Sequence, residues 1–87
     1  MNFEYDENKS RKNLEKHGID FIQAQDLWRD ERMLQVKLDF PDEVRWICVG
    51  KIGSKYYSAF ITYRAENIRI ISVRRSRKKE IFNYENR

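Results

Sequence analysis

The hydrophobic and polar positions in the first part of the chain predict one short strand and two helices. Residues 2–5 carry aromatic side chains at alternate positions, which is the spacing of an extended strand. Residues 7–17 are mostly strong helix formers and are polar nearly all round, so this helix is expected to lie on the surface. Asp6 precedes it as a candidate N-cap, and Gly18 follows it as a C-terminal stop.

A second short helix is predicted after Asp20, which is a candidate cap for it. Its hydrophobic side chains fall at i, i+3, i+6 and i+7, a stripe that needs a sheet or another helix to cover it. The stripe consists of Phe21, Ala24, Leu27 and Trp28. We expect Trp28 to belong to the core.

After Asp30 the pattern changes to the alternation of polar and hydrophobic residues that is typical of strands. The predicted strands, separated by short turns, span residues 33–40, 44–52, 56–63 and 68–73. The fourth is hydrophobic on both faces, which is typical of a central strand. Ser76 is a candidate N-cap for a C-terminal helix that runs through Tyr84. The residues expected to dock this helix are Ile81, Phe82 and Tyr84.

These elements follow the order β-α-α-β-β-β-β-α and predict an α+β fold. Four consecutive strands joined by short turns form an antiparallel meander. We therefore expect a small antiparallel sheet with two N-terminal helices and one C-terminal helix. The chain has 87 residues and shows no internal repeat or linker, so residues 1–87 are expected to form a single domain.

The composition excludes several classes of chemistry. One histidine and one cysteine cannot supply a zinc cluster or an internal disulfide, and the three glycines form no loop that could cradle the phosphates of a nucleotide. A Ser-His-acid triad lacks its nucleophile elbow. We therefore expect no metal ion and no cofactor. The N-terminus has no signal-peptide pattern and no apolar segment is long enough to cross a bilayer, so a cytoplasmic protein without membrane contact is expected.

Positive charge is concentrated at the end of the chain. The net charge is +4, and residues 64–87 hold eight basic and three acidic groups. Guanidinium groups are planar, permanently charged and bidentate toward phosphate, so clustered arginines suit both nucleic-acid binding and the stabilisation of a phosphorane-like transition state. Unbroken strand alternation places Arg69 and Arg75 on one face and Arg74 on the other, unless a bulge intervenes. The alternative interpretation is a solvated basic face with a few surface ion pairs.

Two blocks of residues resemble the BrnT family of toxins, which belong to bacterial type II toxin-antitoxin systems. The first block is Asn-x-x-Lys-His-Gly at residues 13–18, after the opening Phe-Glu-Tyr-Asp at residues 3–6. The second is Arg-Ile-Ile-Ser-Val-Arg-Arg at residues 69–75, with Arg64 before it and Lys79, Glu80 and Tyr84 after it. The resemblance covers nearly the whole chain.

This resemblance implies a RelE-like fold and a toxin that cuts RNA without a metal ion and inhibits translation. In such cleavage the 2′-OH of the RNA is the nucleophile, so the protein must align it, move protons and stabilise the phosphate oxygens. The residues matched to phosphate binding and transition-state stabilisation are Arg64, Arg69, Arg74 and Arg75.

His17 is the implied acid–base residue, because histidine titrates near neutrality. Alternatively, His17 closes the first helix and bonds its terminal carbonyls. Glu80 and Tyr84 share one helix face and are further catalytic candidates, with Glu80 accepting a proton or holding an arginine in place. For both residues the alternative is docking and ion pairing. The remaining candidates, for RNA binding, are Lys16, Arg77, Lys78 and Lys79.

The resemblance also implies a partner, a BrnA-like antitoxin that carries a ribbon-helix-helix DNA-binding part. Because that part is a dimer, the expected complex is a heterotetramer of two toxins and two antitoxins, which contacts operator DNA through the antitoxin. A competing hypothesis is a non-catalytic module that binds nucleic acid or a protein partner. Such a module would bind RNA with steep salt dependence and leave it uncut.

Overall fold

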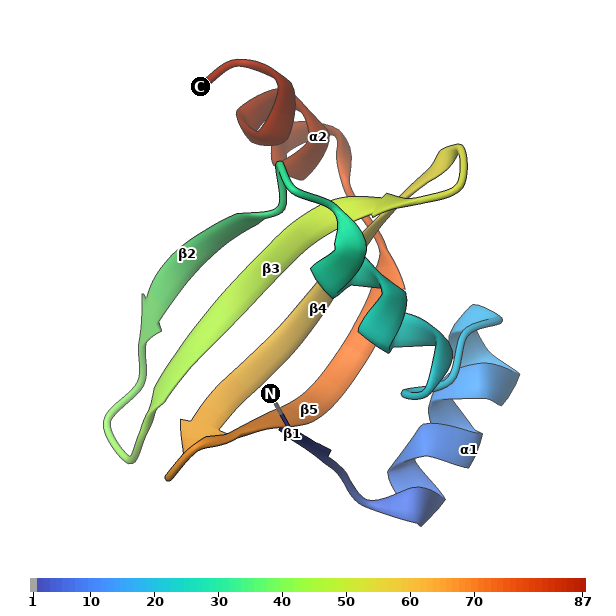
Figure 1. Ribbon diagram of the computed structural model, residues 1–87, viewed down its shortest axis with the longest axis vertical. Coiled ribbons are helices and arrows are strands. Elements are labelled where there is room, and N and C mark those ends of the chain that lie inside the picture. The colour runs from blue at the N-terminus through green and yellow to red at the C-terminus, as the bar shows by residue number, and fades with distance from the viewer. Residues whose placement is uncertain (1) are drawn as a thin grey trace.

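The computed structural model describes residues 2–87 and shows a five-stranded sheet with helices packed on it (Figure 1). The α+β class is confirmed, and four consecutive strands form the predicted antiparallel meander. The strands lie in the order β1-β5-β4-β3-β2. In chain order the elements are β1 (Asn2–Glu4), α1 (Glu7–His17), η1 (Gln23–Arg29), β2 (Leu34–Asp39), β3 (Val44–Ile52), β4 (Lys55–Arg64), β5 (Asn67–Arg75) and α2 (Lys78–Glu85).

The first strand contradicts the prediction of a purely antiparallel sheet. β1 runs parallel to β5, with Asn2 opposite Asn67 and Glu4 opposite Arg69. Short turns determine the directions of the four later strands, whereas no such turn joins β1 to its neighbour. The sheet is therefore mixed, and β5 is an inner strand, as its hydrophobic pattern on both faces indicated.

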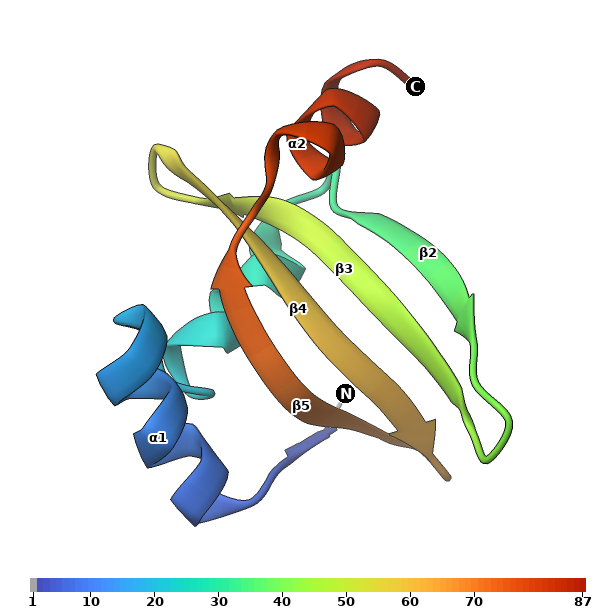
Figure 2. The same ribbon diagram turned by 180° about the vertical axis from the view of Figure 1, so that it is seen from behind.

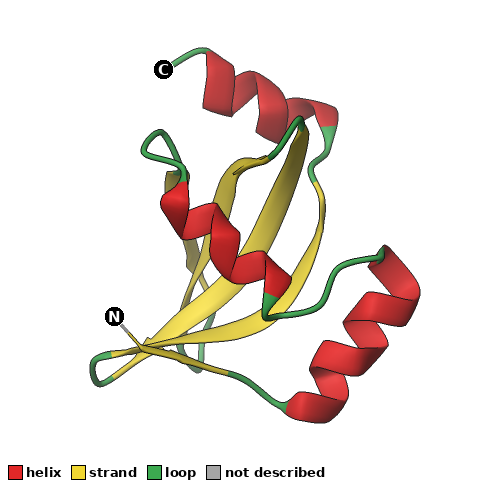
Figure 3. Cartoon of the chain, turned by 45° about the vertical axis from the view of Figure 1, so that its right-hand side comes forward, coloured by secondary structure: helices red, strands yellow, loops and turns green. Residues whose placement is uncertain are grey.

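The helices leave one face of the sheet largely uncovered. α1 and η1 lie on the same side, and α2 lies at one end of the sheet (Figures 1 and 3). Between η1 and the sheet is the core, in which Phe21, Ala24 and Leu27 are buried against strand residues such as Ile61 and Val73. Figure 2 shows the opposite face of the sheet, here called the open face. A helix, α2, covers only one end of this face. In residues 2–87 no helix has the length and apolar character that a membrane span needs.

The second predicted helix is η1, a 3₁₀ helix. A 3₁₀ helix has three residues per turn, so Ala24 and Leu27 fall on one line that faces the core, and Phe21, in the turn before η1, is buried with them. Trp28 lies outside this line and is only partly buried, with its ring edge-on to that of Phe3 at 5.0 Å between centroids. The expectation that Trp28 belongs to the core is therefore met only in part.

The ends of α1 are those that the sequence predicts. The Asp6 carboxylate accepts the backbone N–H groups of Asn8 and Lys9 at 2.8 and 3.1 Å, which satisfies two donors that the helix leaves free. Gly18 has a φ of +74°, in the left-handed region that favours glycine. The one large apolar side chain of α1, Leu14, is 44% exposed, so no hydrophobic stripe attaches this helix.

Polar side chains attach α1 to the sheet instead. Asn13 is buried, and its Nδ2 donates to the backbone carbonyls of Ile19 and Val73 at 2.8 Å each. Its Oδ1 accepts the Val73 N–H at 3.2 Å, and Ser10 Oγ accepts the Phe21 N–H at 2.9 Å. Buried polar groups need such partners. The bonds of Asn13 hold one turn of α1 beside one residue of β5.

The start of α2 differs from the prediction. Its N-cap is Arg77, whose backbone N–H donates to the Glu80 carboxylate at 2.8 Å. Ser76, the predicted cap, shares a hydrogen bond of 2.7 Å with the Ser58 hydroxyl instead, because both side chains lie at the same edge of the open face. Phe82, predicted to dock the helix, is 62% exposed.

Candidate nucleic-acid interface

A bulge in β5 decides which arginines share a face. The β4–β5 register shifts after Phe60 and leaves Ile71 as an extra residue on β5. The alternation of side chains is therefore reversed beyond it. Arg69 and Arg74 both lie on the open face, whereas Arg75 lies on the face that carries the helices. Of the two arrangements that the sequence left open, the one with a bulge is confirmed, and Arg69 therefore does not share a face with Arg75.

Arg74 is bound by Glu80 beneath α2. Its two terminal nitrogens donate to the two carboxylate oxygens of Glu80 at 2.8 and 2.7 Å, and its guanidinium lies over the Phe60 ring. The Ser58 hydroxyl donates to the same carboxylate at 2.8 Å. Arg74, Glu80 and Ser58 are called the Arg74–Glu80 cluster below. The two charged side chains are only 20% and 18% exposed, so Arg74 is engaged within the protein.

The environment of Glu80 favours one of its two predicted roles. Burial raises the pKa of Glu80, but hydrogen bonds from Arg74, from the Arg77 N–H and from Ser58 outweigh it and lower this pKa to about 2. A carboxylate with so low a pKa is a poor proton acceptor near neutrality. The geometry therefore favours Glu80 as the residue that holds Arg74 in place.

We expect Glu80→Gln to remove a pH-dependent contribution to the free energy of unfolding. A carboxyl group whose pKa is lower in the folded chain stabilises the fold above its unfolded pKa, near 4.5, and loses that contribution as the pH falls toward 2. The lowering from 4.5 to about 2 corresponds to about 3 kcal/mol. The free energy of unfolding of the wild type should therefore fall by about 2–3 kcal/mol more than that of Glu80→Gln between about pH 6 and about pH 2.

Urea unfolding of the two proteins at several pH values measures this difference. The other carboxyl groups titrate in both proteins, so the difference isolates Glu80. Curves of unfolding free energy against pH that stay parallel would contradict the assigned role.

The other two predicted phosphate-binding arginines lie elsewhere. Arg69 donates to Glu4 at 3.0 Å across the β1–β5 pair, and Asn67 donates to the same carboxylate at 3.0 Å. The bond from Asn67 and then that from Arg69 lower the pKa of Glu4. Arg64 is exposed at the last position of β4, opposite the start of β5, whereas Arg74 is near the end of β5. The four arginines therefore do not form one cluster.

Tyr84 attaches α2 to the rest of the protein. It is 6% exposed, its OH donates to Asp30 at 2.7 Å, and its ring meets that of Tyr56 edge-on. Burial and the bond to Asp30 raise the pKa of Tyr84. Asp30, which sequence reasoning did not single out, also accepts the backbone N–H groups of Arg32 and Lys51 at 2.9 Å each. Of the two interpretations of Tyr84, these contacts favour docking.

His17 and Arg75 lie at the same end of the contact between α1 and β5. The helix and the strand run in the same direction (Figures 1 and 2), and Asn13 holds α1 beside Val73. His17 is one turn beyond Asn13 on the same face of the helix, and Arg75 is two residues beyond Val73 on the same face of the strand. We call this pair the His17–Arg75 site. Its two members are predicted catalytic residues that are far apart in the sequence.

Both side chains of this site are available to a ligand. Within residues 2–87 neither forms an ion pair or a side-chain hydrogen bond. Arg75 is exposed, and its guanidinium lies over the Tyr57 ring at 5.6 Å from the centroid. His17 is half-buried at the end of α1. The site therefore offers a ligand a guanidinium and an imidazole. In the Arg74–Glu80 cluster, by contrast, the guanidinium is already bound by Glu80.

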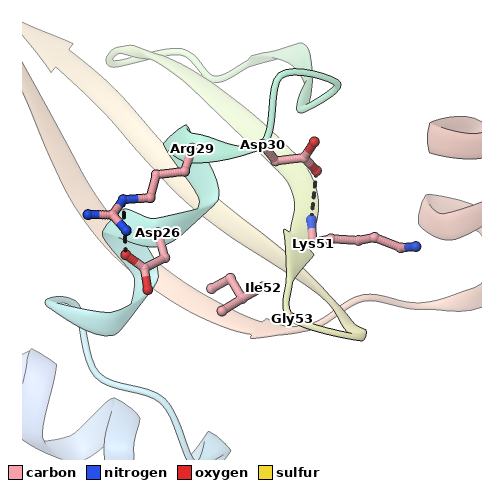
Figure 4. A pocket seen from close by; sticks show the side chains of 6 residues that line it. All are labelled: Asp26, Arg29, Asp30, Lys51, Ile52 and Gly53. Atoms are coloured by element: carbon pink, nitrogen blue, oxygen red, sulfur yellow. Dashed lines mark hydrogen bonds and ion pairs between the residues drawn. The ribbon is translucent and has the colours of Figure 1, made fainter.

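One hollow lies beside this site, and a second hollow adjoins the first. The nearer one has a volume of about 210 Å³ and adjoins the site because Gly18 follows His17 and Tyr57 lies under Arg75. Its lining residues are Gly18, Ile19, Gln23, Asp26, Ile52 and Tyr57. The second, of about 340 Å³, lies between η1 and the β3–β4 turn (Figure 4). Asp26 and Ile52 line both hollows, so the two are neighbours.

The basic side chains predicted to bind RNA are exposed. Lys16 precedes His17 at the end of α1, and the other three stand at the start of α2, directly after β5. These three are Arg77, Lys78 and Lys79. They add positive charge near the end of β5 that carries Arg75. Among the described residues, no three His, Cys, Asp or Glu side chains gather in the manner of a metal site.

Sequence reasoning missed the roles of Asn13 and Tyr57. Asn13 belongs to the first block that resembles the toxin family, but a polar residue on a polar helix gives no sign that it is buried. Tyr57 belongs to a strand and resembles a core aromatic residue. The spacing of Asn13 and His17 is the one signal in the sequence that links these two residues. They are one helical turn apart and therefore lie on the same face of the helix.

The family model described as "Ribonuclease toxin, BrnT, of type II toxin-antitoxin system" matches residues 5–80. That range contains both His17 and Arg75. The search of curated proteins found no match.

Proposed function

The chain belongs to the BrnT family of ribonuclease toxins of type II toxin-antitoxin systems, and we propose that it cuts RNA at the His17–Arg75 site. Membership gives the protein RNA as its substrate and an antitoxin as its partner. The observation that carries the choice of site is the hydrogen bonding of Asn13 to Val73, which brings His17 and Arg75 to one end of the α1–β5 contact.

Arg75 binds the phosphate that is cut. A guanidinium donates two parallel hydrogen bonds to phosphate oxygens and retains its charge at every physiological pH. As negative charge develops on those oxygens in the transition state, the same bonds strengthen. Among residues 2–87 no carboxylate is paired with Arg75, which supports this role, whereas Arg69 and Arg74 are paired with Glu4 and Glu80.

His17 supplies the proton that the leaving group needs. The 2′-oxygen of the RNA attacks the phosphorus, its proton passes to water, and the bond from phosphorus to the 5′-oxygen breaks. The imidazolium of His17 donates its proton to that 5′-oxygen. The products are a 2′,3′-cyclic phosphate and a 5′-OH.

The other predicted residues act around this centre. Lys16, Arg77, Lys78 and Lys79 bind the RNA backbone on either side of the cut phosphate, and the reaction needs no metal ion because the substrate provides its own nucleophile. Arg69, Arg74, Glu80 and Tyr84 hold β1, β5 and α2 in place. Arg64 adds charge at the far end of the sheet. The α+β architecture supports the RelE-like fold that we propose for this chain.

The partner is a BrnA-like antitoxin with a ribbon-helix-helix part, in a heterotetramer of two toxins and two antitoxins. The antitoxin, not this chain, contacts operator DNA. The exposed cations beside Arg75 offer an acidic segment of the antitoxin a complementary surface. When the toxin is released, cleavage of RNA in the cytoplasm inhibits translation.

The products of cleavage test this function. Purified protein should cut a single-stranded RNA in the presence of EDTA and leave 2′,3′-cyclic phosphate and 5′-OH ends. A 2′-deoxy nucleotide at the cut position should abolish cleavage there, because the nucleophile is missing. Uncut RNA that folded protein binds with steep salt dependence would favour the non-catalytic binding module. Products with a 3′-OH, or inhibition by EDTA, would contradict the metal-independent 2′-OH mechanism.

A further inference from the structure

The hollow beside the His17–Arg75 site combines apolar walls with a polar edge. Ile19, Ile52 and Tyr57 form its apolar part, and the aromatic ring of Tyr57 lies beneath the Arg75 guanidinium. Gln23 and Asp26 of η1 form its polar part. Unpaired RNA bases are bound by such combinations, in which a ring or an apolar side chain covers the face of the base and polar groups read its edge.

The 3₁₀ geometry of η1 brings the two polar residues onto one side. Residues three apart in a 3₁₀ helix are eclipsed, so Gln23 and Asp26 lie one above the other. The Oε1 of Gln23 accepts the Asp20 N–H at 2.9 Å, while the Asp20 carboxylate accepts the Gln23 N–H at 2.7 Å. Asp20 therefore bonds the first residue of η1, but the N-cap of η1 is Ile22 and not the predicted Asp20. Within residues 2–87 the amide Nε2 of Gln23 has no hydrogen-bond partner, and Gln23 lines the hollow.

Asp26 keeps an accessible carboxylate. Its ion pair is with Arg29 at 3.9 Å, and the two side chains are 54% and 87% exposed. Figure 4 shows this pair at the rim of the neighbouring hollow, away from Asp30, which is bound to the Lys51 N–H. A long contact between exposed groups is worth little. Asp26 can therefore accept hydrogen bonds from a ligand without breaking a strong internal contact.

We propose that this hollow binds a guanine base of the RNA next to the cut phosphate, an inference that rests on the proposed function. Guanine presents two adjacent donors, N1–H and N2–H, which match the two oxygens of the Asp26 carboxylate. Its O6 acceptor matches the Nε2 donor of Gln23. Adenine, cytosine and uracil each lack the paired donors, so they leave one carboxylate oxygen without a partner. The base lies against Tyr57 and Ile52, and its phosphate reaches Arg75.

Binding of uncleavable RNA tests this subsite separately from catalysis. Four short single-stranded oligonucleotides with 2′-O-methyl sugars throughout differ at one position, which is G, A, C or U in an otherwise uridine sequence. Fluorescence anisotropy measures their dissociation constants. The G oligonucleotide should bind about tenfold more tightly than the other three, which is the order of discrimination that a bidentate contact to a base provides.

A matched pair of variants assigns the preference to Asp26. Asp26→Asn should bring the four dissociation constants to within about twofold of one another, because an amide offers one acceptor oxygen in place of two. Asp42→Asn removes the same charge from an exposed turn between β2 and β3 and should retain the tenfold preference. Equal binding of the four oligonucleotides by the wild type, or a preference that persists in Asp26→Asn, would overturn the proposal.

The two proposals fail in distinguishable ways. If unmodified RNA stays uncut while the G preference is present and depends on Asp26, the result supports the guanine subsite and contradicts the catalytic function. If RNA is cut with the expected ends while the four oligonucleotides bind equally, the ribonuclease stands and the guanine subsite falls.

Discussion

Replacing Arg75 with alanine is expected to slow RNA cleavage about 100- to 1,000-fold, which is the order of loss when one donor to a developing negative charge is removed. Single-turnover rate constants measure this loss directly, because they exclude product release. The fold should be nearly unaffected, since the contact of Arg75 with the Tyr57 ring is exposed and worth about 1 kcal/mol or less. Urea unfolding provides that comparison.

Arg64→Ala is the matched control for Arg75→Ala. It removes the same side chain and charge from an exposed position at the end of β4. That position pairs with the start of β5, whereas Arg75 is at the end of β5. Its rate constant should stay within about twofold of the wild type, because a screened charge at that distance contributes little. Similar losses in the two variants would mean that Arg75 acts only through the overall positive charge of the protein.

His17→Gln is expected to lower the same rate constant about 100-fold, the order of magnitude that a general acid contributes. Glutamine is a good helix former and retains polarity at the end of α1, so the melting temperature should change by only a few degrees. If His17 only closes α1, the variant should lose stability and keep its cleavage rate. A wild-type rate in a folded His17→Gln protein would contradict the proposed role.

The elements that the sequence predicts well are those decided by neighbouring residues. The strand at residues 44–52 has the predicted bounds, and α1 begins after Asp6 and ends before Gly18. The parallel pairing of β1 depends instead on contact with residues more than sixty positions away. The bulge at Ile71 is of the same kind, since a register shift depends on the partner strand and leaves no periodic signal in its own strand.

The candidate site was predictable as a set of residues but not as an arrangement. Resemblance to the toxin family suggested that all of the arginines bind phosphate. Their charge alone does not indicate which of them form ion pairs within the protein. The structure separates them, because Glu4 binds Arg69 and Glu80 binds Arg74, while Arg75 has no such partner in the described chain. Ion pairs between distant segments are a property of the folded chain, so composition and spacing could not reveal them.

The most direct test of His17 as the proton donor uses an RNA with sulfur in place of the 5′-bridging oxygen at the cut position. A thiolate leaves without being protonated, so the absence of a general acid should no longer matter. We predict that His17→Gln cuts this RNA within about fivefold of the wild-type rate, although it cuts ordinary RNA about 100-fold more slowly. Arg75→Ala should be slow on both. An equal deficit of His17→Gln on the two RNAs would contradict proton donation by His17.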